Sequence, residues 1–286
     1  MTPLAVGLVL ASALAHASWN LLAKNASESR VFAWLCVVSA AAITAPLAVA
    51  QLVVSDSAPS PGSLLFPAVS GLIHVAYFWT LARAYRAGDL SLVYPLARGS
   101  GPLLAVIVSV VVFGERPSLL AALGIAGILL GVLCLTGDPR ALRSSAIGAA
   151  VIFALVTGAI IATYTLWDKY GVSTVGVPPL LYFCVLMGTC GLFQIPWALQ
   201  DRGRAVLEIS AFWKRSLLAG ALVALAYTLV LTALVTSPVA YVAPMREIGI
   251  LFGAILGHKL LAEGQTRKRI VGSLIMVLGV GALAAG

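Results

Sequence analysis

Apolar stretches long enough to cross a lipid bilayer follow one another along almost the whole of this chain of 286 residues. A transmembrane helix needs about 20 predominantly apolar residues. Here 61% of the residues are hydrophobic and 10% are charged, whereas a soluble domain carries roughly 45–50% apolar and about 25% charged residues. The composition excludes a soluble globule, a disordered chain, a disulfide scaffold and a nucleic-acid-binding module. It predicts an all-α membrane protein.

The apolar runs between charged or Pro-, Gly- and Ser-rich breaks predict ten transmembrane helices. They occupy residues 4–23, 31–53, 63–82, 91–113, 118–136, 146–167, 177–199, 216–235, 238–257 and 268–285. The connections between them are short, so we expect no separate soluble domain.

Lys and Arg residues are concentrated on one side of the predicted spans. Connections after odd-numbered spans, counted together with Lys268 and Arg269 at the start of the last span, carry 14 of the 18 Lys and Arg residues, and the other connections carry only Arg116 and Lys169. Because cytoplasmic loops are enriched in Lys and Arg, we expect both termini to be non-cytoplasmic, in a bacterial cytoplasmic (inner) membrane. The net charge of +8 then faces anionic membrane lipid and indicates no nucleic-acid partner.

A shift of 148 residues aligns the second half of the chain with the first. The clearest pairs are Arg98 with Arg246, Gly101 with Gly249 and Glu115 with Glu263. The predicted halves, 1–140 and 141–286, hold five spans each, and an odd number inverts the second half in the membrane. Inverted five-helix repeats are typical of secondary transporters, which bind substrates near the midplane between the repeats.

Short motifs recur at equivalent places in the two halves. They are Tyr94-Pro95-Leu96-Ala97-Arg98 and Gly114-Glu115 in the first half, and Ala262-Glu263 in the second. With these motifs and the duplication, the whole chain resembles the EamA-type branch of the drug/metabolite transporter superfamily. The resemblance implies a ten-helix transporter, often an exporter of amino acids or other small metabolites. Many members keep both termini in the cytoplasm, a pattern from which the loop charges here depart.

Three ionisable residues, Arg98, Arg246 and Glu247, lie deep inside predicted spans. Such groups are costly in hydrocarbon and are functional candidates by default. The arginines would bind a substrate carboxylate or phosphate, or would have structural partners. Glu247 would bind a substrate ammonium or a coupling proton, or would neutralise one of the arginines.

A polar stripe runs along the first predicted span. His16, Asn20 and Lys24 recur every four residues, with Trp19 beside them. A polar stripe avoids lipid and should face the interior of the bundle. His16 would either change its charge during transport or form a neutral hydrogen bond to another helix.

Two further spans carry aromatic and polar residues on one face. At helical spacing these are His74, Tyr77, Phe78 and Leu81 in one span, and Thr157, Tyr164 and Asp168 in the other. Aromatic walls suit a small amphipathic ligand, so Tyr77 and Tyr164 are candidate substrate-binding residues. Ordinary helix packing is the alternative.

Glu115 and Glu263 fall in the last turn of predicted helices, where the helix dipole disfavours a carboxylate. We expect both to accept hydrogen bonds from backbone N–H groups in the first turn of the next helix. Pro102 and Pro244 are expected to kink their spans.

Small residues recur along the fifth predicted span. They include Gly124, Gly127 and Gly131. We expect them to permit close helix packing.

The sequence contains no metal-ligand spacing and no nucleotide-binding motif. We therefore expect a secondary transporter, in the export direction, for a small polar metabolite that is amino-acid-like or an organic anion, with no catalytic residue, metal or cofactor. The expected partners are this substrate, a coupling proton or counter-substrate, and membrane lipid, and the expected oligomeric state is a monomer. A membrane-embedded enzyme and a lipid-carrier flippase of the same fold are the alternatives.

The loop charges predict the orientation of the chain. Alkaline phosphatase fused to the C-terminus should be active, because the enzyme folds only outside the cytoplasm. An inactive phosphatase together with a fluorescent cytoplasmic reporter at the same site would contradict the assignment.

Overall fold

The computed structural model describes residues 1–23, 29–55, 59–88, 90–136, 147–261 and 267–286. All regular structure in these ranges is helical. The helices are α1 (Pro3–Ala23), α2 (Arg30–Ser55), the 3₁₀ turn η2 (Pro61–Leu64), α3 (Leu65–Ala87), α4 (Leu90–Val112), α5 (Leu119–Thr136), α6 (Ile147–Ser173), α7 (Pro179–Ala198), α8 (Arg202–Thr236), α9 (Val239–Met245), α10 (Ile248–Leu261) and α11 (Arg267–Ala285).

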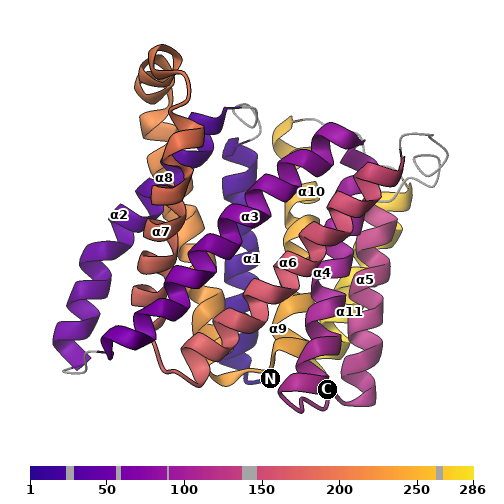
Figure 1. Cartoon of the computed structure of the whole chain (residues 1–286). Helices are drawn as coiled ribbons and strands as arrows, with labels where there is room; N and C mark the ends of the chain where they lie inside the picture. Colours follow the sequence, from indigo (N-terminus) through magenta and orange to yellow (C-terminus); the bar gives the residue numbers. More distant parts are fainter. Residues whose placement is uncertain (24–28, 56–58, 89, 137–146, 262–266) are drawn as a thin grey trace.

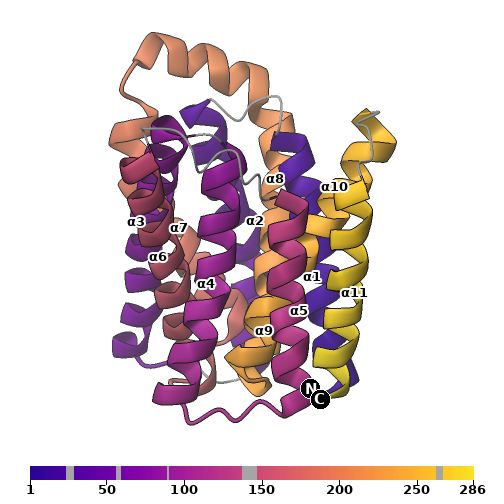
Figure 2. The same ribbon diagram turned by 90° about the vertical axis from the view of Figure 1, so that its right-hand side faces the viewer.

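Each predicted span coincides with a helix, except that two helices divide the ninth. Within the described residues, six helices are long and apolar enough to cross a membrane, by length and composition: α1, α2, α3 with η2, α6, α7 and α8. Shorter apolar helices occupy Leu96–Val112, Leu119–Cys134 and Val271–Ala285. Figures 1 and 2 show the helices side by side, with the two chain ends close together at one end of the bundle.

The connection expected before the eighth span is itself helical, which corrects the sequence reading. α8 is 35 residues long and begins at Arg202, where the carboxylate of Asp201 accepts a hydrogen bond of 3.0 Å from the N–H of Arg204. This is an N-cap, and it stabilises the first turn. The charges in this segment concealed the helix from an analysis based on apolar runs. Figure 2 shows the first part of α8 lying across the end of the bundle opposite the termini.

Two charged side chains bind backbone groups at the C-terminal end of α8 and at the N-terminal end of α9, which follows it directly in the chain. Lys169 is part of α6, not of a connection as expected, and its Nζ donates to the carbonyls of Leu234 and Ser237 at 2.9 and 3.1 Å. The carboxylate of Glu115 accepts from the N–H groups of Val239 and Ala240, both at 2.7 Å. Helix termini leave such groups without intrahelical partners.

Glu115 was expected to cap the helix that follows it, and this was wrong in one respect. Its partners are N–H groups of a first helical turn, but that turn belongs to α9, in the other half of the chain. The carboxylate therefore joins the two halves. Glu263 lies outside the described residues.

Helices at equivalent places in the two halves make equivalent contacts. The shift of 148 residues relates α1 to α6, α2 to α7, α3 to α8 and α5 to α11. Helix α1 packs on α8 and α10, as α6 packs on α3 and α4. Helix α2 packs on α8 as α7 packs on α3, and the pairs α2–α7 and α5–α11 each join equivalent helices. These pairings map onto one another when the halves are exchanged.

Glycines allow α5 and α11 to pack backbone against backbone. A Cβ atom placed on Gly124 would lie 2.6 Å from the nitrogen of Leu283 and 2.7 Å from the carbonyl oxygen of Gly279. Gly127 and Gly131 also face α11. Because any Cβ at Gly124 meets backbone, which cannot rotate away, this contact requires glycine.

We expect Gly124→Ala to lower stability by about 1–3 kcal/mol, the usual cost of overpacking. Gly7→Ala is the matched control, because a Cβ there has no atom within 4 Å and the change favours the helix. Unfolding in mixed detergent micelles measures both variants. Equal stability of the two would contradict the packing account.

Candidate functional site

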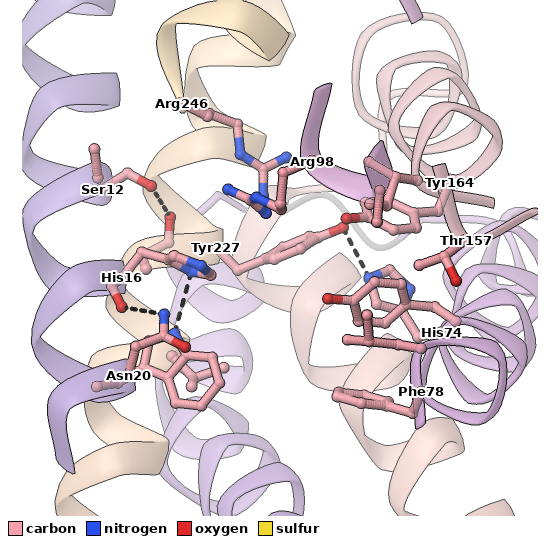
Figure 3. Close-up of a pocket in the computed structure, with 18 of the residues that line it drawn as sticks. Ser12, His16, Asn20, His74, Phe78, Arg98, Thr157, Tyr164, Tyr227 and Arg246 are labelled. Atoms are coloured by element: carbon pink, nitrogen blue, oxygen red, sulfur yellow. Dashed lines mark hydrogen bonds between the residues drawn. The ribbon is translucent and has the colours of Figure 1, made fainter. Parts of the chain in front are cut away.

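One cavity of about 270 Å³ lies among helices from both halves of the chain. Its wall is formed by α1, α3, α4, α6, α7, α8 and the junction between α9 and α10. Figure 3 shows the labelled residues around it: Ser12, His16 and Asn20 from α1 on one side, His74, Phe78, Thr157 and Tyr164 on the other, and Arg98, Tyr227 and Arg246 between them. Residues far apart in the sequence thus converge on one space.

The break between α9 and α10 presents Arg246 and Glu247 to the interior. α9 ends at Met245, and Arg246 and Glu247 form a turn before α10 begins at Ile248. The turn is closed by short-range bonds, with the N–H of Glu247 donating to the carbonyl of Pro244 at 3.0 Å. The sequence predicted a kink from Pro244, and the structure has an interrupted helix. The equivalent helix, α4, is continuous from Leu90 to Val112.

Glu247 neutralises Arg98, which is the structural alternative left open by the sequence. The Nε of Arg98 donates to Oε2 of Glu247 at 3.0 Å, and their side chains are 14% and 5% exposed. The pair joins α4 to the α9–α10 turn, and so joins the two halves. Because both side chains are largely buried, removal of either partner would leave a buried charge uncompensated.

Arg246 lies against an aromatic ring instead of a carboxylate. Its guanidinium carbon is 5.6 Å from the ring centroid of Tyr227, which is within the range of a cation–π contact. Among the residues that the structure describes, Arg246 forms no ion pair. Taken together, these two arginines and one glutamate carry one surplus positive charge.

Hydrogen bonds within α1 fix the protonation pattern of His16. The Nε1–H of Trp19 donates to Nδ1 of His16 at 3.1 Å, and the side-chain amide of Asn20 donates to the His16 carbonyl at 2.7 Å. Because the indole N–H can only donate, Nδ1 of His16 has no proton in this arrangement. His16 is thus a neutral ring whose proton is on Nε2. Lys24, the last residue of the expected stripe, lies outside the described residues.

The opposite wall is built around His74. Its ring centroid lies 4.3 Å from that of Tyr164, 5.5 Å from that of Tyr227 and 6.4 Å from that of Tyr77. The ring is 4% exposed. Three tyrosine rings thus surround one buried imidazole.

The structure brings the predicted residues together. The cavity is lined by Arg98, Arg246, His16, Trp19, Asn20, Tyr77 and Tyr164, and Glu247 reaches it through its bond to Arg98. Under the 148-residue shift, Arg98 corresponds to Arg246 and His16 to Tyr164, so equivalent positions of both halves line one space. This is the geometry expected of a site between repeats.

The sequence reasoning missed part of the wall and its support. Ser70, Tyr182 and Tyr227 were not singled out, yet all three donate hydrogen bonds to Asp168. These residues come from α3, α7 and α8. Their one signal in the sequence is that a carboxylate at position 168 lies within an apolar helix and needs donors from somewhere.

A double-mutant cycle tests the Arg98–Glu247 pair. Glu247→Gln should lower stability by about 3–5 kcal/mol, because Arg98 stays buried without its counter-ion, whereas Arg98→Met with Glu247→Gln should cost less. Arg204→Met is the control, since it breaks an exposed i,i+4 pair that should contribute under about 1 kcal/mol. Strict additivity of the two single changes, measured by unfolding in mixed micelles, would show that the pair contributes nothing.

Comparison with known proteins follows the same two-part division. The chain matches the EamA-like transporter family over residues 3–137 and again over residues 148–284. No curated protein matches it. One solved structure, titled only "Crystal structure of protein", has a TM-score of 0.72 at 15% sequence identity, covering 97% of this chain and 98% of that chain. At this identity the likeness shows a common fold.

The two family matches together cover almost the whole chain, and the helices include several that are long and apolar enough to cross a membrane. The chain therefore belongs to the EamA-like transporter family and is a multi-pass membrane protein.

Proposed function

We propose that this protein is a secondary transporter that carries a small metabolite with a carboxylate or phosphate group across the membrane. The observation behind this proposal is the surplus positive charge of the cavity. Arg98 is compensated by Glu247, whereas Arg246 forms no ion pair among the described residues and lies against the ring of Tyr227. A guanidinium in this position has its planar donors free for a bidentate bond to an anion.

The proposed mechanism is alternating access between two inverted repeats. Ten spans, divided as 1–140 and 141–286, would place the cavity between two halves of opposite orientation. The exchangeable helix pairings and the joint contribution of both halves to the cavity support this arrangement. Rocking of one repeat against the other would open the cavity to each side in turn.

The proposed substrate is of amino-acid size. Drug-sized ligands occupy pockets of roughly 300–1,000 Å³, and this cavity of about 270 Å³ is at the lower limit. The carboxylate would bind Arg246, and the aromatic wall around His74 would contact the apolar part. Glu247 is already paired with Arg98, so the charges of the site provide for the carboxylate of an amino-acid-like substrate and not for its ammonium group. Export is the direction that the family resemblance implies.

The proposal includes the membrane orientation derived from loop charge, with both termini outside the cytoplasm in a bacterial inner membrane. The ends lie together, which is compatible with an even number of spans on either orientation. A membrane-embedded enzyme or a lipid-carrier flippase would use the same fold differently, and transport assays separate the three.

The first experiment is a thermal-shift screen of amino acids, organic anions and phosphorylated metabolites on purified protein. A ligand at 100 times its Kd stabilises the folded state by about 2.7 kcal/mol. Flux of the best binder into proteoliposomes without chemical change would support transport. A new product, or movement of labelled lipid alone, would favour the enzyme or the flippase.

Substitutions of Arg246 then test how the substrate binds. A hydrogen bond to a charged group contributes about 1.5–3 kcal/mol, so Arg246→Ala should weaken binding by roughly 10–150-fold. Arg246→Lys should restore only part, because lysine has no planar pair of donors. Arg202→Ala, at an exposed position, is the control. Unchanged affinity in folded Arg246→Ala would overturn the anion site.

A further inference from the structure

We infer that His74, Tyr227 and Asp168 form a binding site for one exchangeable proton in the cavity wall. This inference rests on the proposed transport function for its purpose, since the proton would be the coupling ion. The site itself follows from the geometry of the hydrogen bonds, independently of any substrate. Figure 3 shows His74 and Tyr227 facing each other at the cavity.

Asp168 is arranged as an ionised carboxylate. It is 1% exposed and accepts from three hydroxyl groups: from Ser70 at 2.5 Å and Tyr182 at 2.9 Å on Oδ1, and from Tyr227 at 2.5 Å on Oδ2. Hydroxyl bonds to a charged carboxylate are about 2.5–2.7 Å long. Three donors converging on one buried carboxyl group favour its charged form.

The first ring nitrogen of His74 must carry a proton. Its Nδ1 lies 2.8 Å from the carbonyl oxygen of Ser70, and a carbonyl oxygen can only accept. The Ser70 hydroxyl is 3.5 Å from the same nitrogen, but its single hydrogen is already donated to Asp168. Nδ1 is therefore a donor in this arrangement.

The second ring nitrogen of His74, Nε2, must then carry a proton as well. The Nε2 of His74 lies 3.1 Å from the hydroxyl of Tyr227. That hydroxyl has one hydrogen, which it donates to Asp168. A hydrogen bond between Nε2 and Tyr227 therefore needs a hydrogen from the imidazole. With both nitrogens protonated, His74 is an imidazolium, paired with the Asp168 carboxylate through Tyr227.

The surroundings of the cluster support a cation at His74. Burial opposes both charges, and the guanidinium of Arg246 also opposes the imidazolium, whereas the Asp168 carboxylate and the Ser70 carbonyl stabilise it. The charged and titratable groups that face the cluster come from several elements: Tyr77 from α3, Tyr164 from α6, Tyr182 from α7, Tyr227 from α8 and Arg246 from the α9–α10 turn. Arg246 is the one other cation among them.

Loss of the proton would disturb the site in a defined way. When Nε2 of His74 transfers its proton to cavity water, the ring becomes neutral and the water becomes hydronium. The single hydrogen of Tyr227 then has two acceptors, Asp168 and His74, and one of them loses its donor. Because Arg246 lies over the Tyr227 ring, the change occurs directly beside the proposed anion site.

The inferred sign of coupling is cooperative. An imidazolium at the cavity wall adds positive charge, so proton binding should strengthen the binding of an anion, and the anion should strengthen proton binding by the same factor. The expected process is movement of the substrate anion together with a proton. His16, by contrast, accepts a bond from Trp19 on Nδ1 and is not part of this site.

Nitrogen NMR of histidine-labelled protein in nanodiscs tests the proton site without any substrate. The chain has three histidines, so His16→Gln and His258→Gln assign the signals. A protonated and an unprotonated ring nitrogen resonate far apart. We expect His74 to have two protonated nitrogens in part of the range from about pH 5 to 8, where histidine titrates, and His16 to keep an unprotonated Nδ1.

Two substitutions identify the partners of the proton. In Asp168→Asn and in Tyr227→Phe, the population of doubly protonated His74 should be at least tenfold lower than in the unmodified protein at the same pH. Asp201→Asn and Tyr241→Phe are matched controls, because both side chains lie in other parts of the fold, and they should leave the His74 signals unchanged. Tyr227→Phe keeps the ring, so it serves if Asp168→Asn does not fold.

Two results would overturn the inference: one protonated nitrogen on His74 throughout this pH range, or doubly protonated His74 that neither substitution affects. Coupling is measured separately, with a pH indicator in weak buffer, as proton uptake when the carboxylate that binds best in the thermal-shift screen is added. Protonated His74 without proton uptake would refute coupling but keep the site. A confirmed site in a protein that transports no anion would refute the proposed function alone.

Discussion

The absence of water inside a bilayer decides the structure at the centre of this bundle. A charge there must meet an opposite charge, an aromatic face or a hydrogen bond supplied by the protein itself. Arg98 meets Glu247, and Arg246 meets the ring of Tyr227. The first contact joins one half of the chain to the other. It lies at the turn that divides the ninth predicted span into α9 and α10. The same interruption delivers Arg246 to the cavity.

Helix ends follow the same rule. α8 ends and α9 begins inside the protein, and their unpaired backbone groups are satisfied by Lys169 and Glu115. Each side chain binds two backbone groups. Glu115 comes from the short motif that first suggested a duplication, and the structure gives that motif a physical purpose: a carboxylate from one half holds a helix of the other. The halves are thus joined at the cavity and at a helix end.

Besides the contacts between the two halves, the cavity wall contains Arg246 and His74, which differ in the kind of positive charge that they can carry. The charge of the Arg246 guanidinium is permanent, whereas the proton that we infer on His74 would be exchangeable, and Tyr227 contacts both side chains. A permanent cation can hold an anion, and a titratable one beside it can make that hold depend on pH. The carboxylate of Asp168 would compensate the positive charge of the inferred His74 imidazolium, to which it is linked through the Tyr227 hydroxyl.

The sequence identified the helices well, because a chain in hydrocarbon must satisfy its backbone within each segment and must show an apolar run for every one. It also identified the residues of the cavity, since ionisable groups such as Arg98 and Arg246 are scarce in apolar runs and cannot face lipid. It failed for the first part of α8, where charges concealed a surface helix, and for the interruption at Arg246 and Glu247.

The sequence left the hydrogen-bond and ion-pair partners of these residues open for a different reason. Apolar periodicity shows which residues face inward, but Glu247 had two candidate arginines, and Ser70, Tyr182 and Tyr227 carry no signal of their own. A hydrogen bond between side chains depends on positions to within tenths of an ångström, and helices far apart in the sequence set those positions together. The sequence by itself therefore determined the membrane helices and the inward-facing charges. Only the tertiary structure decided that Arg98 pairs with Glu247, that Arg246 does not, and that Asp168 is linked to His74, because each of these contacts joins separate helices.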